Sequence, residues 1–252
     1  MPASSTVPEP ADAAAVLSVV PVLGVGEITG GTDLGEEIVA ALARRPDGPR
    51  LTDGDVLVVT QKVVSKAEGR VVPIDADDPA AKEALVEHEA VRVLRRRGEL
   101  LITETTHGFI CANAGIDLSN MAEGTAALLP VDPDRSARRI RSSLERRTGQ
   151  RVGVVVSDTF GRTWRRGVTD VAIGCAGVAA VIDLRGTIDA SGRELVATEI
   201  CVADEIAGAA ELVMGKAAGV PAVIVRGLPA SWLRPGSVAD EIVRPPAEDL
   251  FR

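Results

Sequence analysis

Short apolar runs alternate with longer amphipathic segments along the chain. The runs are rich in Val, Ile and Leu and are bounded by Gly, Asp or Pro, a pattern typical of strands that are buried on both faces. We predict strands at Leu17–Leu23, Asp55–Thr60, Glu99–Thr105, Arg151–Ser157, Ala180–Leu184 and Pro221–Gly227. Because helical patterns separate most of these runs, their order predicts a mixed α/β protein.

Four amphipathic segments are predicted to form helices. In the first, Asp33 can cap the helix while Glu36 reaches back three positions, and Pro46 ends it. The third begins after the cap Asp132 and ends before Gly149. The second and the fourth are predicted over Pro79–Arg97 and Thr198–Gly215.

The two ends of the chain differ from its middle. Residues 1–16 are expected to form a disordered tail, whereas residues 17–228 carry all the predicted elements. Residues 229–252 are expected to be a C-terminal segment or a linker, because the periodic pattern fades there. The chain has no basic start, and no run reaches the roughly 18 apolar residues of a spanning helix, so we expect neither a signal peptide nor a membrane partner.

Composition narrows the function further. The net charge of −8 argues against a general nucleic-acid binder, because such proteins need positive charge to neutralise phosphates. The three Cys residues form no metal-type spacing, which indicates neither a disulfide scaffold nor a zinc module and favours a reducing cytoplasm. Aromatic residues make up 2% of the chain, so a base-stacking platform is not expected.

Two segments carry candidate phosphate-binding groups. Residues Gly24–Gly31 follow a predicted strand and could hold a phosphate on free backbone N–H groups, but their G-x-G-x-x-x-G spacing misses the dinucleotide fingerprint, and a plain turn is the alternative. Lys62 and Lys66 follow the next strand and lie four residues apart, on one side of a helical turn. An exposed basic turn would have the same sequence.

Two further segments carry acidic side chains. The stretch His107–Asn120 contains the isolated acid Asp117 and suits a hard cation or a polar ligand. The strand at Arg151–Ser157 runs into Asp158 and Thr159, which are followed by Arg162, Arg165 and Arg166. An acid and a hydroxyl at a strand end can hold a cation and phosphate, and nearby arginines can neutralise an anionic substrate. A capped turn with a basic face is the alternative.

The sequence has no P-loop and no G-x-S-x-G elbow. The acids, the hydroxyl, the lysines, the arginines and the glycine-rich turn that remain favour metal-assisted phosphoryl transfer.

Five ordered segments together resemble one enzyme family. Their sequences are GDVLVVTQKVVSKAEGRVV, ETTHGFICANAGIDLSN, LLPVDPDRSARRIR, VGVVVSDTFGRTWRRG and ELVMGKAAGVPAVIVRGL. They resemble the coenzyme F420-0:L-glutamate ligase family, specifically the N-terminal ligase part of the bifunctional actinobacterial enzyme. The resemblance covers roughly residues 17–228, which would form the catalytic domain.

The resemblance implies an activity, cofactors and an assembly. The activity is GTP-dependent addition of L-glutamate to F420-0, then of further γ-linked glutamates, through an acyl phosphate and with release of GDP and phosphate. Two divalent cations, Mg²⁺ or Mn²⁺, would take part, and K⁺ would assist. The fold implied is a two-lobed subunit with mixed β-sheets flanked by helices, in an intertwined homodimer.

The resemblance also assigns residues by motif. Asp117 and Asp158 would hold one divalent cation, and Thr159 would help to hold the second. Lys66 would offset charge on the phosphates, and Arg165 is our own candidate for binding F420-0 or glutamate. The GTP site would be lined by Val25, Gly26, Glu27, Ile28, Gln61, Lys66, Asn120, Met214, Gly215, Lys216, Ala217, Ala218, Gly219, Val220 and Pro221.

One position departs from the family pattern. Lys216 stands where archaeal single-domain members have a Gln beside the second cation, and a protonated lysine cannot ligate a metal, so a contact with phosphate is the alternative. Two other functions are weighed against the ligase. A dinucleotide-dependent oxidoreductase would use the turn at Gly24–Gly31, and a non-catalytic GTP-binding sensor would keep the fold without turnover.

Overall fold

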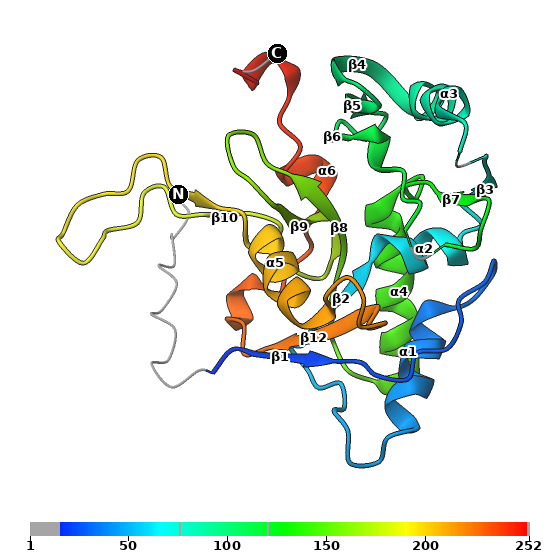
Figure 1. Ribbon diagram of the computed structural model, residues 1–252. Coiled ribbons are helices and arrows are strands. Elements are labelled where there is room, and N and C mark those ends of the chain that lie inside the picture. The colour runs from blue at the N-terminus through cyan, green and yellow to red at the C-terminus, as the bar shows by residue number, and fades with distance from the viewer. Residues whose placement is uncertain (1–15, 76, 120, 251–252) are drawn as a thin grey trace.

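A computed structural model describes residues 16–75, 77–119 and 121–250, so nearly all of the predicted tail at residues 1–16 lies outside the described residues (Figure 1). The mixed α/β prediction is confirmed. Within these ranges the main sheet has five strands in the order β1-β12-β2-β8-β9. They are β1 (Ser18–Pro21), β12 (Ala222–Arg226), β2 (Val56–Thr60), β8 (Gly153–Gly161) and β9 (Val168–Ala176). Strands β1, β2 and β8 run in one direction, and β12 and β9 run in the other.

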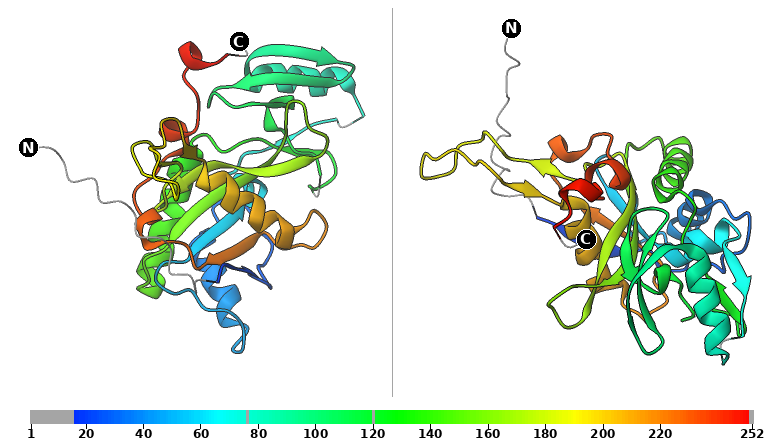
Figure 2. Two further views of the ribbon diagram at one scale, coloured as in Figure 1. Left: turned by 90° about the vertical axis from the view of Figure 1, so that its left-hand side faces the viewer. Right: turned by 90° about the horizontal axis from the view of Figure 1, so that it is seen from above.

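Helices cover both faces of the main sheet. The helices α1 (Leu34–Ala43) and α4 (Pro133–Thr148) lie on one face, and α5 (Val202–Met214) lies on the other (Figure 2). The predicted cap residues are confirmed: Asp33 accepts a hydrogen bond from the N–H of Glu36, and Asp132 accepts one from the N–H of Arg135. The carboxylate of Glu36 does not reach back to the cap as predicted but accepts a hydrogen bond from Arg147 of α4. Gly149 ends α4 with a φ of 72°, which favours glycine.

A second lobe is inserted between β3 (Val71–Pro73) and β7 (Thr125–Ala127), which pair with each other. The lobe contains α3 (Pro79–Glu89), the antiparallel strands β4 (Ala90–Arg97), β5 (Leu100–Thr105) and β6 (Ile110–Ala112), and the short 3-10 helix η1 (Asn113–Gly115). Val71 lies opposite Ala127, so the chain leaves and re-enters the main body at one place. The helix α2 (Gln61–Ala67) lies at this junction (Figure 1).

The predicted helix at Pro79–Arg97 is wrong in its second half. The helix α3 ends at Glu89, Ala90 takes an extended conformation, and the rest of the segment forms β4. A tight turn at Gly98, which has a φ of 58°, brings β4 alongside β5. Pairing with a neighbouring strand therefore outweighs the helix propensity of the Leu and Arg residues in this segment.

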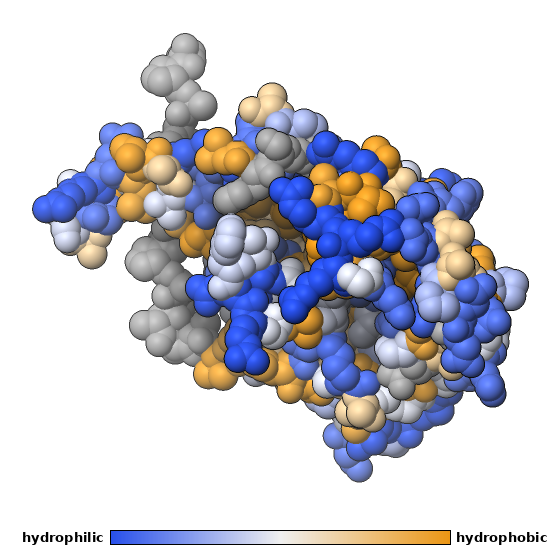
Figure 3. Space-filling model, turned by 45° about the horizontal axis from the view of Figure 1, so that its top comes forward, coloured by the Kyte–Doolittle hydropathy of each residue, from blue (hydrophilic) through white to orange (hydrophobic). Residues whose placement is uncertain are grey.

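An arm projects from the body between β10 (Ile182–Asp183) and β11 (Glu199–Ile200) (Figures 1 and 3). The predicted strand at Ala180–Leu184 is therefore shorter than expected. The helix predicted from Thr198 begins later, at Val202, because two residues before it pair with β10. The arm's tip is hydrophilic, and its apolar side chains Ile188 and Val196 are exposed.

The C-terminal segment packs against the main body through a buried carboxylate. Asp134, in the first turn of α4, accepts hydrogen bonds from the N–H groups of Cys175 (2.7 Å), Val238 (3.0 Å) and Ala239 (3.1 Å) and from Oγ of Ser237 (2.9 Å). These contacts join α4 and β9 to α6 (Val238–Glu241), which lies between the short 3-10 helices η2 (Ala230–Trp232) and η3 (Pro246–Glu248). None of the helices within the described ranges is long and apolar enough to cross a bilayer.

Candidate active site

Four of the predicted segments meet at one edge of the main sheet. Because β1, β2 and β8 run parallel and β12 runs against them, the carboxyl ends of the first three lie beside the amino end of β12. Thr60 at the end of β2 lies opposite Ser157 of β8, and its N–H donates to the carbonyl oxygen of Pro221 at 3.0 Å. Residues 24–31, 61–66, 158–162 and 214–221 adjoin these ends. Open α/β sheets bind their ligands at such an edge.

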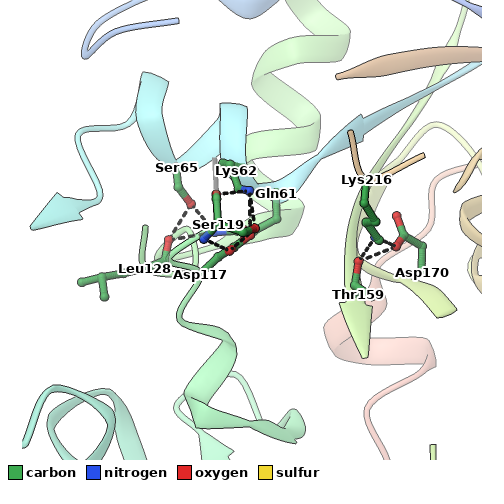
Figure 4. A network of polar contacts seen from close by, with 9 residues as sticks. All are labelled: Gln61, Lys62, Ser65, Asp117, Ser119, Leu128, Thr159, Asp170 and Lys216. Atoms are coloured by element: carbon green, nitrogen blue, oxygen red, sulfur yellow. Dashed lines mark hydrogen bonds and ion pairs between the residues drawn. The ribbon is translucent and has the colours of Figure 1, made fainter. Parts of the chain in front are cut away.

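Asp117 comes to the site from the second lobe. Its backbone exchanges two hydrogen bonds with Ala127 of β7, at 3.0 and 2.9 Å. Nζ of Lys62 lies 2.9 Å from Oδ2 of Asp117, and Oδ1 accepts hydrogen bonds from the N–H and Oγ of Ser119 (Figure 4). Burial raises the pKa of Asp117, but the hydrogen bonds from Lys62 and Ser119 outweigh burial, so its pKa lies below the usual value. Asp117 is therefore an ionised carboxylate at neutral pH.

Asp158 lies in β8 directly after Ser157, the last residue of this strand that pairs with β2, and it is the least compensated carboxylate of this group. Burial is the largest cause that raises the pKa of Asp158 to about 7, and the charges of Asp117 and Asp170 act in the same direction. The N–H of Thr159 and the charge of Lys216 act in the opposite direction. A bound cation would stabilise the charged form of such a carboxylate.

A second cluster of polar side chains lies around Asp170 of β9, whose side chain is only 4% exposed. Oδ1 of Asp170 accepts hydrogen bonds from Oγ1 of Thr159 (2.6 Å) and from Nζ of Lys216 (3.0 Å), and Oδ2 accepts one from Oγ of Ser157 (3.1 Å). Nζ of Lys216 also donates to Oγ1 of Thr159 (Figure 4). The same Nζ lies 3.2 Å from Oε1 of Glu211. Sequence reasoning missed Asp170, because only the pairing of β9 with β8 places it opposite Thr159.

Lys66 and Gln61 both belong to α2, but one forms an ion pair at the surface and the other forms hydrogen bonds in the interior. Nζ of Lys66 lies 3.0 Å from Oε1 of the exposed Glu27, and this ion pair joins the glycine-rich segment to α2. Gln61 is buried, and its Nε2 donates to Oγ of Ser65 at 2.6 Å and to the carbonyl oxygen of Leu128 at 3.0 Å. The donor group of Gln61 is therefore engaged in packing α2 against the segment after β7.

The other predicted site residues divide into buried and accessible ones. Ile28 and Met214 are buried in the core. Arg165 is exposed in the hairpin between β8 and β9. Asn120 lies outside the described residues. Accessible residues along the edge include Val25, Gly26, Gly215, Ala217, Ala218, Gly219, Val220 and Pro221.

Asp117 and Asp158 supply the carboxylate oxygens that a hard divalent cation takes as ligands. Mg²⁺ is usually bound in proteins by one or two carboxylates, and water and substrate phosphates complete its shell. No three His, Cys, Asp or Glu side chains in the described part of the chain converge to hold a metal by themselves. Two carboxylates therefore suit a cation that arrives with phosphate oxygens rather than a closed structural metal site.

A cavity of about 840 Å³ lies apart from these carboxylates, between α1, α2 and α4. Its walls include Arg135, Arg138, Arg139 and Arg146 of α4, but neither Asp117 nor Asp158. The candidate site is thus an open edge of the sheet and not the interior of this cavity.

Aspartates and lysines gathered at the edge where the parallel strands of a mixed sheet end are typical of α/β enzymes that bind anionic ligands. Comparison with known proteins then identifies the family. The profile of the F420-0:gamma-glutamyl ligase family matches residues 23–227, so this chain belongs to that family.

Relatives named coenzyme F420:L-glutamate ligase are similar over almost the whole chain. The protein from Archaeoglobus fulgidus is 43% identical over 250 positions, which cover 94% of this chain and 96% of the relative. The protein from Methanothermobacter thermautotrophicus is 40% identical over 252 positions, which cover 94% of this chain and 99% of the relative. The chain is therefore a ligase, and the alternative of a dinucleotide-dependent oxidoreductase is set aside.

Proposed function

We propose that this chain catalyses the GTP-dependent ligation of L-glutamate to coenzyme F420-0 and then adds further γ-linked glutamates. The names of its relatives support the ligated substrates. The observation that carries the use of a nucleotide is the meeting of Asp117 and Asp158 at the sheet edge, where the glycine-rich segment and Lys66 also lie. Carboxylates for a divalent cation and a lysine for a phosphate are the groups that phosphoryl transfer requires.

The proposed reaction has two steps. A carboxylate oxygen of F420-0 attacks the γ-phosphorus of GTP, which forms the acyl phosphate and breaks the bond to GDP. The amine nitrogen of glutamate then attacks the acyl carbon, phosphate leaves with the bonding electron pair, and the nitrogen loses a proton. When bound, a divalent cation would neutralise charge on the phosphates.

The chain's own residues would orient this reaction. Asp117, fixed by Lys62 and Ser119, and Asp158 would hold the divalent cation. Lys66 can exchange the exposed carboxylate of Glu27 for a phosphate oxygen, because this ion pair lies at the surface and is weak.

We assign binding of the anionic groups of F420-0 or glutamate to the hairpin between β8 and β9. It carries Arg162, Arg165 and Arg166, none of which forms an ion pair with an acid within the described ranges. Trp164 at the same turn is 89% exposed and has a φ of 67°, a strained conformation for a bulky residue. Such an exposed cationic turn can close over a ligand that carries phosphate and carboxylate groups.

The assembly and the remaining conditions are also proposals. We propose that the protein is a cytoplasmic homodimer of intertwined two-lobed subunits and that K⁺ assists the reaction. The arm between β10 and β11 supports such a dimer, because it projects from the body and exposes Ile188 and Val196.

A mass-spectrometric assay tests the activity. The full chain is incubated with F420-0, L-glutamate, GTP and Mn²⁺ or Mg²⁺, and products heavier by whole glutamyl units are expected, together with GDP and phosphate. Asp158→Asn should lower the rate by about 100-fold or more, because it removes charge from the proposed cation site. Asp47→Asn, at an exposed position after α1, is the matched control and should retain the rate. Binding of GTP with no glutamylated product would contradict the ligase and support the non-catalytic sensor.

A further inference from the structure

Lys216 lies among oxygen atoms that could otherwise surround a metal ion. Its Nζ contacts Oγ1 of Thr159 and Oδ1 of Asp170, the latter at 3.0 Å (Figure 4). It also lies 3.2 Å from Oε1 of Glu211. Carboxylate and hydroxyl oxygens are the ligands that hard divalent cations prefer. We propose that the Lys216 ammonium is a built-in cation that fills this cluster, so that the site takes one divalent cation, at Asp117 and Asp158, and none at Thr159.

The burial of Asp170 makes a cation necessary at this position. A carboxylate that is only 4% exposed is costly unless a positive charge and hydrogen bonds compensate it. The hydroxyls of Thr159 and Ser157 supply two of the hydrogen bonds, and Lys216 supplies the positive charge. Loss of that charge would leave a vacant oxygen cluster with a net negative charge.

The protonated amine cannot share this cluster with a metal. A lysine is ordinarily an ammonium at neutral pH, and the carboxylates of Asp170 at 3.0 Å and Glu211 at 3.2 Å favour that charged form of Lys216. An ammonium group has three donors and no lone pair, so it competes with a metal for Oγ1 of Thr159. A second cation would have to displace Lys216 first.

Lys62 and Lys216, the lysines that contact the aspartates, differ in how they are held. Lys62 belongs to α2 and also donates to the carbonyl oxygen and Oγ of Ser119. Lys216 belongs to the exposed segment after α5, and its side chain is 56% exposed although its ammonium contacts a buried carboxylate. It therefore enters the cluster from the solvent side, and a substitution there changes the charge without removing a core contact.

Counting bound Mn²⁺ tests this inference, which rests on the proposed divalent-cation site of the ligase. The full chain is saturated with a non-hydrolysable GTP analogue, so that phosphate oxygens are present, and is titrated with Mn²⁺. Free Mn²⁺ is measured by electron paramagnetic resonance and corrected for the ions that the analogue binds alone, and folding of each variant is checked by circular dichroism. We expect one bound ion for the wild type and for Lys216→Arg, which keeps the charge. Lys216→Gln removes the charge and adds an amide oxygen, so it should bind two ions, and Asp170→Asn added to Lys216→Gln should restore one.

The outcomes separate the inference from the proposed function. Two ions on the wild type, or one on a folded Lys216→Gln, would overturn the inference and leave the first cation site standing. No ion on the wild type would overturn both. If Lys216→Gln does not fold, Thr159→Val decides: an Mn²⁺ affinity within about twofold of the wild type is expected, and a tenfold loss would mean that Thr159 ligates a metal.

Discussion

Removing the carboxylate of Asp134 should greatly destabilise the protein, although Asp134 lies outside the candidate active site. Its four hydrogen bonds of 2.7 to 3.1 Å engage the N–H groups of the buried residues Cys175 and Val238, the N–H of the exposed Ala239 and one hydroxyl. A buried polar group that loses its partner costs about 1–3 kcal/mol, and such losses do not add fully. We therefore expect Asp134→Ala to lower the free energy of unfolding by about 4 kcal/mol, within the range for breaking a buried charged network.

Asp134→Asn should lie between the wild type and Asp134→Ala. Its amide oxygen can still accept from Cys175 and Val238, but its NH₂ group would face the N–H of Ala239, so about half of the loss is expected. Urea-induced unfolding of the full chain, followed by circular dichroism, measures both variants. Asp240→Ala, at an exposed position in α6, is the control and should stay within about 0.5 kcal/mol of the wild type. A loss below about 1 kcal/mol for Asp134→Ala would refute the reasoning.

Three other predictions concern a cap, a close contact and a substrate. Asp33→Ala should lower the free energy of unfolding by about 1–2 kcal/mol at neutral pH. Burial raises the pKa of Asp33, but hydrogen bonds from Ser143 and the N–H of Glu36 and the charge of Arg147 outweigh burial and lower the pKa from 3.8. The stabilisation by Asp33 is therefore complete above pH 3.8 and is lost as the pH falls below it. Urea unfolding at decreasing pH in which the stabilities of the wild type and Asp33→Ala did not converge would contradict this. Gly174→Ala would place a Cβ 2.3 Å from the carbonyl carbon of Pro133 and should lower the free energy of unfolding by about 1–3 kcal/mol. Gly208→Ala, in α5, would place a Cβ 3.7 Å from Oγ1 of Thr169 and should raise the free energy of unfolding by about 0.5–1 kcal/mol in the same measurement. Arg165→Ala should raise the Michaelis constant for F420-0 far more than that for GTP in steady-state assays, and equal effects would rule out the assigned role.

Features that depend on residues close together in the sequence could be predicted from the sequence. The caps Asp33 and Asp132 and the terminal Gly149 act within one helical turn, so their patterns alone set the ends of α1 and α4. The segment at Ala90–Arg97 has no such local signal. Its strand depends on a partner across the turn at Gly98, and the prediction of a continuous helix was wrong for that reason.

The site shows the same division. Asp117 and Asp158 could be selected because each is an isolated acid at a strand end or in a polar loop, whereas the sequence gives no reason to select Asp170. Asp170 becomes part of the site because antiparallel pairing sets it opposite Thr159 and because Lys216 arrives from a segment 46 residues away along the chain. Contacts between residues that are far apart in the sequence and are brought together by the fold cannot be predicted from the spacing of residues within one segment.

The pairing of β3 with β7 has a consequence for how this protein can vary. The second lobe is attached through two adjacent strands, and Asp117 is hydrogen-bonded to Ala127 on one of them and contacted by Lys62 of α2. Asp117 is thus held beside β3 and β7, the two strands that attach the lobe, and not at the far end of the lobe. Loops and strands farther out can be lengthened, shortened or exchanged between homologues while Asp117 keeps its contacts with Ala127 and Lys62. The lobe therefore offers a place where specificity can diversify without moving this carboxylate.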